Sequence, residues 1–165
     1  MSINPTEFRQ VLSRFASGVT VISTFGLDGK PIGVTVSSFT SLSLNPPLVL
    51  ICLDLQTSQL PAYTESKAFG INILALGQEA ISNAFAFSGA VPPFEQFEYS
   101  KGSLGLPMLN GTLASLECSL ETVYPGGDHV IIVGAVEHVT WRKDLEPLIY
   151  ATGQYHKLAA LDPVT

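Results

Sequence analysis

The chain has 165 residues, a length that fits one domain with a substantial buried core. Only 13% of its residues are charged, against about 25% in a typical soluble protein, which predicts the extra buried surface that a homodimer supplies. The net charge of −6 and the absence of a basic stripe argue against nucleic-acid binding. The longest apolar run, Leu48–Leu53, is too short to span a membrane.

The two cysteines, Cys52 and Cys118, stand far apart in apolar, strand-like segments. Such a context is typical of buried free thiols rather than of a disulfide, and it predicts a reducing, cytoplasmic environment. The cysteines and the three histidines show no metal-ligand spacing, so we expect no metal site.

Residues 4–18 are predicted to form a helix with one apolar face. Asn4 can cap the first turn, and Gly18 ends the pattern. The apolar residues that recur at helical spacing, and so should pack against the rest of the protein, are Phe8, Val11, Leu12 and Phe15. Residues 19–25 are then β-rich, and the tight-turn signal Asp28-Gly29 predicts a hairpin with a return strand.

The return strand, residues 33–47, reads GVTVSSFTSLSLNPP and carries six hydroxyl side chains but no charged residue. Small hydroxyls can hold a phosphate or the polar edge of a ring. A Ser/Thr-rich strand without a ligand is the alternative, because Thr favours strands. Composition by itself favours a strand that binds no ligand.

The rest of the chain alternates strands with short helices. Strands are predicted at 48–54 and 69–74, helices at 58–67 and 78–87, and an irregular segment at 88–109. Two long strands, 112–124 and 129–141, form the clearest hairpin, and 145–158 is expected as a short strand or irregular segment across the barrel mouth. Since hairpins dominate and no βαβ alternation appears, the fold class is mainly β, an antiparallel barrel with a few flanking helices, in a single domain over 1–165.

The chain has no Rossmann, Walker A or nucleophile-elbow motif. Asp128 and His129 are adjacent, so on a strand they would point to opposite faces, which argues against a catalytic triad. Their turn, Gly126-Gly127-Asp128-His129, is a second candidate site: the glycines would let a ligand approach while His129 offers an aromatic face and a donor. In the alternative, the glycines only form the turn.

Several blocks, in this order, resemble a known family. They are the amphipathic helix from Phe8 to Phe15, the V-S-S-F…P-P block (36–47), F-G-I-N-I-L (69–74) and G-D-H (127–129). The chain resembles the short-chain flavin reductases, the reductase partners of two-component flavin-dependent monooxygenases, from Phe8 to Leu158. The resemblance implies a Greek-key, FMN-binding split barrel and a homodimer with flavin sites at the subunit interface. It also implies hydride transfer from NADH or NADPH to FMN or FAD, with reduced flavin passed to a partner monooxygenase.

The resemblance further implies a set of site residues. Those matching the flavin-holding segment are Thr35, Val36, Ser37, Ser38 and Ser41. Those matching the turn near the phosphate-bearing tail are Asp54, Thr57 and Ser58. Those matching the nicotinamide motif and its surroundings are Gly127, Asp128 and Tyr155. We expect His129 to position the nicotinamide, because hydride transfer is the cofactors' own chemistry and needs aligned rings rather than a proton donor.

Two departures from the family pattern leave alternatives open. Ala151-Thr152-Gly153 stands where many members have His-Arg-Gly, and Leu55-Gln56 where a basic residue is common. With so few cations, phosphate binding would rest on hydroxyls and amides, so the choices between FMN and FAD and between NADH and NADPH stay open. The missing His-Arg-Gly run motivates an alternative, a flavin- or haem-binding split barrel without reductase turnover. A pyridoxamine-phosphate oxidase-like enzyme would need more cations than the eight scattered bases provide.

Overall fold

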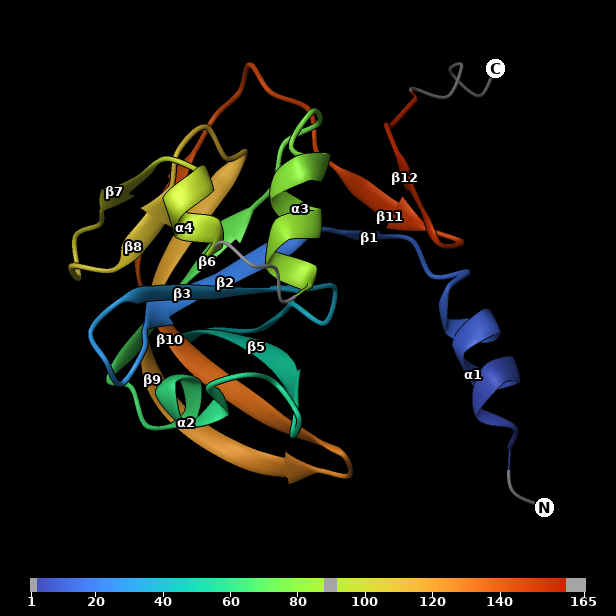
Figure 1. Ribbon diagram of the computed structural model, residues 1–165, viewed down its shortest axis with the longest axis horizontal. Coiled ribbons are helices and arrows are strands. Elements are labelled where there is room, and N and C mark those ends of the chain that lie inside the picture. Colours follow the sequence, from blue (N-terminus) through green and yellow to red (C-terminus); the bar gives the residue numbers. More distant parts are fainter. Residues whose placement is uncertain (1–2, 88–91, 160–165) are drawn as a thin grey trace.

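A seven-stranded antiparallel sheet forms the main body of the computed structural model, which describes residues 3–87 and 92–159 (Figure 1). The strand order is β3-β2-β6-β9-β10-β5-β4. The strands are β2 (Thr20–Phe25), β3 (Pro31–Val36), β4 (Thr40–Leu44), β5 (Pro47–Asp54), β6 (Ala68–Ile73), β9 (Ala114–Gly126) and β10 (His129–Trp141). The prediction of a mainly β, antiparallel fold is confirmed, as are the hairpins β2–β3 and β9–β10.

The sheet curves until its two ends share one core. On β5, Val49, Ile51 and Leu53 are buried while the residues between them are half-buried, as expected for a strand with one face inward. Val34 and Val36 pack against the same buried cluster, although they lie on β3, the strand at the opposite end of the sheet. No strand pairing joins β3 to β5 in the part of the chain that the structure describes, so the barrel is split there.

The predicted strand at 33–47 is in fact two strands at opposite ends of the sheet, so that prediction is wrong. β3 ends at Val36, and β4 begins at Thr40 and pairs with β5. Between them, the Ser38 hydroxyl donates to the Cys52 carbonyl oxygen at 2.9 Å and accepts from the Cys52 amide at 3.0 Å. This side chain therefore completes the hydrogen bonding of β5 where the chain crosses the split.

Two predicted helices are confirmed as shorter segments, α2 (Leu60–Thr64) and α3 (Glu79–Ala86). The segment predicted to be irregular instead holds α4 (Pro93–Gln96), β7 (Tyr99–Lys101) and β8 (Pro107–Leu109), and its residues 88–91 lie outside the described residues. Asn72 joins β8 to the barrel core: its Oδ1 accepts from the Leu109 amide, and its Nδ2 donates to the Val21 carbonyl oxygen and to Ser23 Oγ. No local pattern signals such long-range pairing.

The N-terminal helix α1 (Pro5–Leu12) stands away from the barrel (Figure 1). Asn4 caps it as predicted, accepting from the Thr6 amide at 2.8 Å. The apolar side chains predicted to pack within this chain, three on α1 and one just after it, are nevertheless between 51% and 80% exposed, so that prediction is wrong: Phe8, Val11, Leu12 and Phe15. Within the described ranges, no helix is long and apolar enough to cross a membrane.

A small second sheet connects α1 to the chain end. β1 (Ser17–Gly18) pairs with β11 (Ile149–Ala151), which pairs with β12 (Gln154–His156). Within the predicted segment 145–158, residues 146–148 run along the barrel, where the Leu76 amide donates to the Glu146 carbonyl oxygen and the Leu148 amide donates to the Leu74 carbonyl oxygen. β11 and β12 then form a hairpin between the barrel and α1 (Figure 1). The Thr152 amide donates to the Ser13 carbonyl oxygen at 2.7 Å and ties this hairpin to the end of α1.

Candidate functional site

Seven of the predicted site residues come together around one cavity of about 370 Å³, which we call the hydroxyl cavity. They are Thr35, Val36, Ser37, Ser38, Asp54, Thr57 and His129. The tertiary structure explains the gathering: β10 pairs with β5 so that His129 lies opposite Asp54, and Ser38 binds β5 at Cys52. Three segments far apart in the sequence therefore meet beside the split of the barrel.

The hydroxyls around this cavity divide into two groups. Thr35 Oγ1 donates to the Ser82 carbonyl oxygen at 2.7 Å, and Ser38 is bound to both backbone groups of Cys52. These two side chains hold the walls in place. Among the described residues, the hydroxyls of Ser37 and Thr57 have no hydrogen-bond partner, so they are free to bind a ligand.

His129 is held at the edge of the cavity by its neighbour in sequence. The His129 Nδ1 lies 2.7 Å from Asp128 Oδ1, and since a carboxylate only accepts, Nδ1 carries the proton and Nε2 is left for a ligand. The hydrogen bond from His129, and then its charge, lower the pKa of Asp128. The prediction that these side chains point to opposite faces is wrong, because Asp128 lies in the turn, where Gly127 has a φ of +77°.

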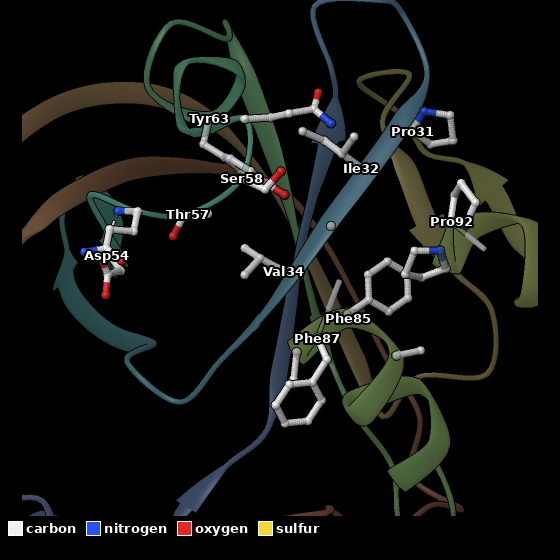
Figure 2. A pocket seen from close by; sticks show the side chains of 16 residues that line it. Pro31, Ile32, Val34, Asp54, Thr57, Ser58, Tyr63, Phe85, Phe87 and Pro92 are labelled. Carbon is white, nitrogen blue, oxygen red and sulfur yellow. Dashed lines mark hydrogen bonds between the residues drawn. The ribbon is translucent and has the colours of Figure 1, made fainter. Parts of the chain in front are cut away.

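A second cavity, of about 500 Å³, adjoins the first and shares Val34, Asp54 and Thr57 with it; we call it the aromatic cavity (Figure 2). Phe85, Phe87 and Pro92 lie on one side of it in Figure 2, with Thr57, Ser58 and Tyr63 on the other. Ser58, predicted near the phosphate-bearing tail, therefore borders this cavity and not the hydroxyl cavity.

A third cavity, of about 290 Å³, lies beside the end of β3 and shares residues 35–37 with the hydroxyl cavity. Tyr155 borders it and donates from its hydroxyl to Ser82 Oγ or Asn83 Oδ1, both at 2.9 Å. The predicted Tyr155 is thus near the flavin-holding segment but is separated from His129, which borders only the hydroxyl cavity among these three.

Three predicted residues lie outside the walls of these cavities. Ser41 is exposed on β4, and Gly127 and Asp128 form the β9–β10 turn. The tertiary structure also adds two residues that the sequence did not single out, Tyr63 and Ser82, because only contacts between distant segments place them there. No three His, Cys, Asp or Glu side chains of residues 3–87 and 92–159 could share a metal ion.

The charge of the three cavities is distinctive. Among the described residues that line them, Asp54 has the only carboxylate and His129 the only imidazole, and none is Lys or Arg. The groups that these described residues offer to a ligand phosphate are hydroxyls and backbone amides.

A split antiparallel barrel with contiguous cavities lined by hydroxyls, aromatic rings and one histidine defines a class of protein that can hold flat, polar-edged rings. The chain belongs to the flavin reductase like domain family, whose model matches residues 12–159. The resemblance inferred from the sequence is therefore confirmed.

Individual relatives agree with this assignment. The chain is 39% identical over 154 residues to the flavin-dependent monooxygenase reductase subunit HsaB of Rhodococcus jostii, covering 93% of this chain and 78% of that protein. It is 40% identical over 151 residues to the 4-hydroxyphenylacetate 3-monooxygenase reductase component of Thermus thermophilus, covering 92% and 95%. The solved structure of the Streptomyces globisporus NADH:FAD oxidoreductase SgcE6 with NAD and FAD fragments superimposes with a TM-score of 0.88 at 34% identity, covering 96% and 97%. The predicted split-barrel fold is confirmed.

Proposed function

We propose that this protein is an NADH-dependent flavin reductase that transfers a hydride from the nicotinamide to FMN or FAD. The observation that carries the proposal is the hydroxyl cavity, where the 33–38 segment, the turn after β5 and His129 meet. Relatives named as NADH-dependent flavin reductase, FMN reductase (NADH) and NADH-dependent FAD reductase support it.

The residues around the hydroxyl cavity fit a flavin ring. Val34 and Val36 give an apolar wall for a flat ring, while the Ser37 hydroxyl, which has no partner among the described residues, can donate to its polar edge. A bound flavin supplies the hydride acceptor. Thr35 and Ser38, each bonded to the backbone of another segment, keep the walls rigid, which preorganises the donors for the charge that develops on reduction.

The turn after β5 links the flavin side to the nicotinamide side. Asp54 Oδ1 accepts from the Gln56 amide at 2.8 Å, and its carbonyl oxygen accepts from the Thr57 amide at 2.9 Å. The Leu55 amide donates to the Asp128 carbonyl oxygen at 2.9 Å. Since a carboxylate repels a phosphate, we assign Asp54 to shaping the turn, and the hydroxyls of Thr57 and Ser58 to holding the phosphate-bearing tail.

His129 is the residue that we assign to the nicotinamide. Asp128 engages Nδ1 and so orients the ring, which borders the hydroxyl cavity and keeps Nε2 unengaged by Asp128. The imidazole positions the nicotinamide against the flavin, where the reacting atoms need to be about 3–3.5 Å apart.

The test is anaerobic spectroscopy of the purified protein with FMN or FAD, followed by NADH or NADPH. We expect NADH to bleach the flavin absorbance, and no bleaching by either nucleotide with either flavin would contradict the proposal. A yellow or haem chromophore that stays bound and is not bleached would instead identify the alternative, a binding protein without turnover, which is motivated by Ala151-Thr152-Gly153 standing where many members have His-Arg-Gly.

The role of His129 has a matched control on the same strand. His129→Ala should slow flavin reduction more than it weakens flavin binding, whereas His138→Ala should change neither, because His138 is exposed on β10 and borders none of the three cavities. If His129→Ala weakens flavin binding and leaves the reduction rate of the bound flavin intact, the assigned role is wrong.

We also propose a cytoplasmic homodimer that passes reduced flavin to a partner monooxygenase. The two free cysteines support a cytoplasmic location, and relatives named as reductase components of monooxygenases support the monooxygenase partner. The exposed apolar face of α1 supports the dimer, because a second copy would remove it from water. Light scattering should give twice the chain mass of 17.6 kDa, and Phe15→Glu should lower it towards one chain. A monomeric native protein would contradict the dimer.

A further inference from the structure

We propose that Ser82, on α3, is a positioning residue of the flavin site: it holds the segment 35–37 in the shape that binds the flavin, and Tyr155 steadies that segment through it. This inference rests on the proposed reductase function. Ser82 is only 2% exposed, and it borders the third cavity but not the hydroxyl cavity. It therefore acts on a flavin in the hydroxyl cavity through other residues.

The backbone of Ser82 anchors the end of β3. Its carbonyl oxygen accepts from Thr35 Oγ1 at 2.7 Å, across 47 positions of sequence. The pairing of β3 with β2 ends at Val36, so this bond lies one residue before the chain leaves the sheet. Ser37 follows directly and borders both the hydroxyl cavity and the third cavity. The direction in which Ser37 leaves the strand therefore depends on the anchor at Thr35.

The side chain of Ser82 meets the C-terminal hairpin. The Tyr155 hydroxyl on β12 lies 2.9 Å from Ser82 Oγ and 2.9 Å from Asn83 Oδ1. The Tyr150 ring on β11 packs edge-to-face against the Tyr155 ring at a centroid distance of 5.4 Å and so restricts its movement. In Figure 1, α3 stands between β3 and this hairpin. Ser82 thus joins β3 to β12, which belong to different sheets.

The helix itself does not require a hydroxyl at position 82. Ala has a higher helix propensity than Ser, and a Ser inside a helix commonly bonds a carbonyl of the preceding turn or points to solvent. The Ser82 hydroxyl is instead buried and bonded to another element. Because its hydroxyl and its carbonyl oxygen belong to one residue of a helix, a displacement of Ser82 also displaces Thr35 and the wall of the hydroxyl cavity.

A direct contact with the nicotinamide is the competing role for Tyr155, which the family resemblance implied near the nicotinamide motif. The two roles differ in the ligand that they affect. Positioning through Ser82 changes the segment that holds the flavin, so it changes flavin affinity. Direct contact with the nicotinamide changes the KM for NADH.

The experiment measures Kd for FMN and FAD by fluorescence titration and KM for NADH in steady-state turnover at saturating flavin. Ser82→Ala and Tyr155→Phe each remove the bond between the two hydroxyls. Asn83→Ala is the matched control, because it removes the other partner of the same Tyr155 hydroxyl and keeps the bond to Ser82.

We expect Ser82→Ala and Tyr155→Phe to raise Kd for both flavins about three- to ten-fold, the effect of one lost hydrogen bond. KM for NADH should stay unchanged, and Asn83→Ala should raise Kd less than about two-fold. The double variant Ser82→Ala with Tyr155→Phe should raise Kd no more than the larger single change, since both changes remove the same bond. Thermal melting confirms that each variant is folded, and Tyr155→Phe carries the test if Ser82→Ala is not.

Three results would overturn the inference: an unchanged Kd for flavin in both single variants, additive effects in the double variant, or a higher KM for NADH with an unchanged Kd for flavin. All three leave flavin reduction intact and the proposed function standing. If the unmodified protein binds flavin but NADH and NADPH do not reduce it, the proposed function fails, and the titrations still decide the role of Ser82. Binding of neither flavin would overturn both.

Discussion

The contact between Gly33 and Phe85 makes a quantitative prediction about how the site is held together. Gly33→Ala places a methyl group 2.6 Å from Phe85 Cε1, 2.7 Å from Cδ1 and 3.2 Å from a Cγ of Val21. The ring has little room to retreat, because Phe85 is 4% exposed and lies against Phe94 at 4.9 Å and Phe97 at 6.5 Å. Either β3 or α3 must therefore move.

The expected loss of stability follows from overpacking. An added methyl in a tightly packed core costs about 1–3 kcal/mol, whereas replacing Gly by Ala gains only about 0.4–1 kcal/mol from the unfolded chain where the backbone suits Ala. The clash therefore prevails. For a chain of this length each kcal/mol shifts Tm by about 2–4 °C, so a net loss of about 1–2 kcal/mol lowers Tm by about 2–8 °C.

The assay is thermal and chemical denaturation of Gly33→Ala beside Gly18→Ala, where the added Cβ meets no atom within 4 Å. The control should be as stable as the unmodified protein or slightly more so. The double variant Gly33→Ala with Phe85→Leu should be more stable than the sum of the single changes predicts, because Leu lacks the ring atoms that clash. Strict additivity, or a Gly33→Ala variant as stable as the control, would refute the reasoning.

Three further predictions concern buried or strained groups. Asn72→Asp replaces the amide that donates to the Val21 carbonyl oxygen by a buried carboxylate, and should lower the unfolding free energy by more than about 3 kcal/mol at neutral pH. This loss of stability should shrink as pH falls towards about 4, because protonation of the new carboxylate removes its charge. A loss that does not change with pH would contradict the prediction. Burial raises the pKa of Cys118 to about 12. In a Cys52→Ser variant, which leaves Cys118 as the thiol to be labelled, we therefore expect no reaction with a thiol reagent at pH 8 until the protein is unfolded. Rapid labelling of the folded variant would contradict this prediction. Thr152 has a φ of +53°, so Thr152→Gly should raise Tm by relieving about 1 kcal/mol of backbone strain. A lower Tm would show that the Thr152 side chain stabilises the folded protein by more than the backbone strain destabilises it.

The sequence alone determined the features that depend on local chemistry. The alternation of Val49, Ile51 and Leu53 and the turn residues at Gly126-Gly127 act within a few positions, so the strands β5, β9 and β10 and their hairpin appear where they were predicted. The order of the family blocks extended this reading to the split barrel and to the residues around the hydroxyl cavity.

Only the tertiary structure decided where distant segments meet. The 33–47 segment has the alternation of one strand, yet the chain crosses the split at Ser38, whose hydroxyl makes two hydrogen bonds to the backbone of Cys52. A side chain that takes the place of a strand partner leaves no periodic signal in the sequence. The apolar face of α1 has helical spacing, but spacing does not say whether its partner is in the same chain. Likewise, Tyr63 and Phe85 lie on opposite sides of the aromatic cavity although they are 22 positions apart, because residues so distant in the sequence border one cavity only when the barrel closes.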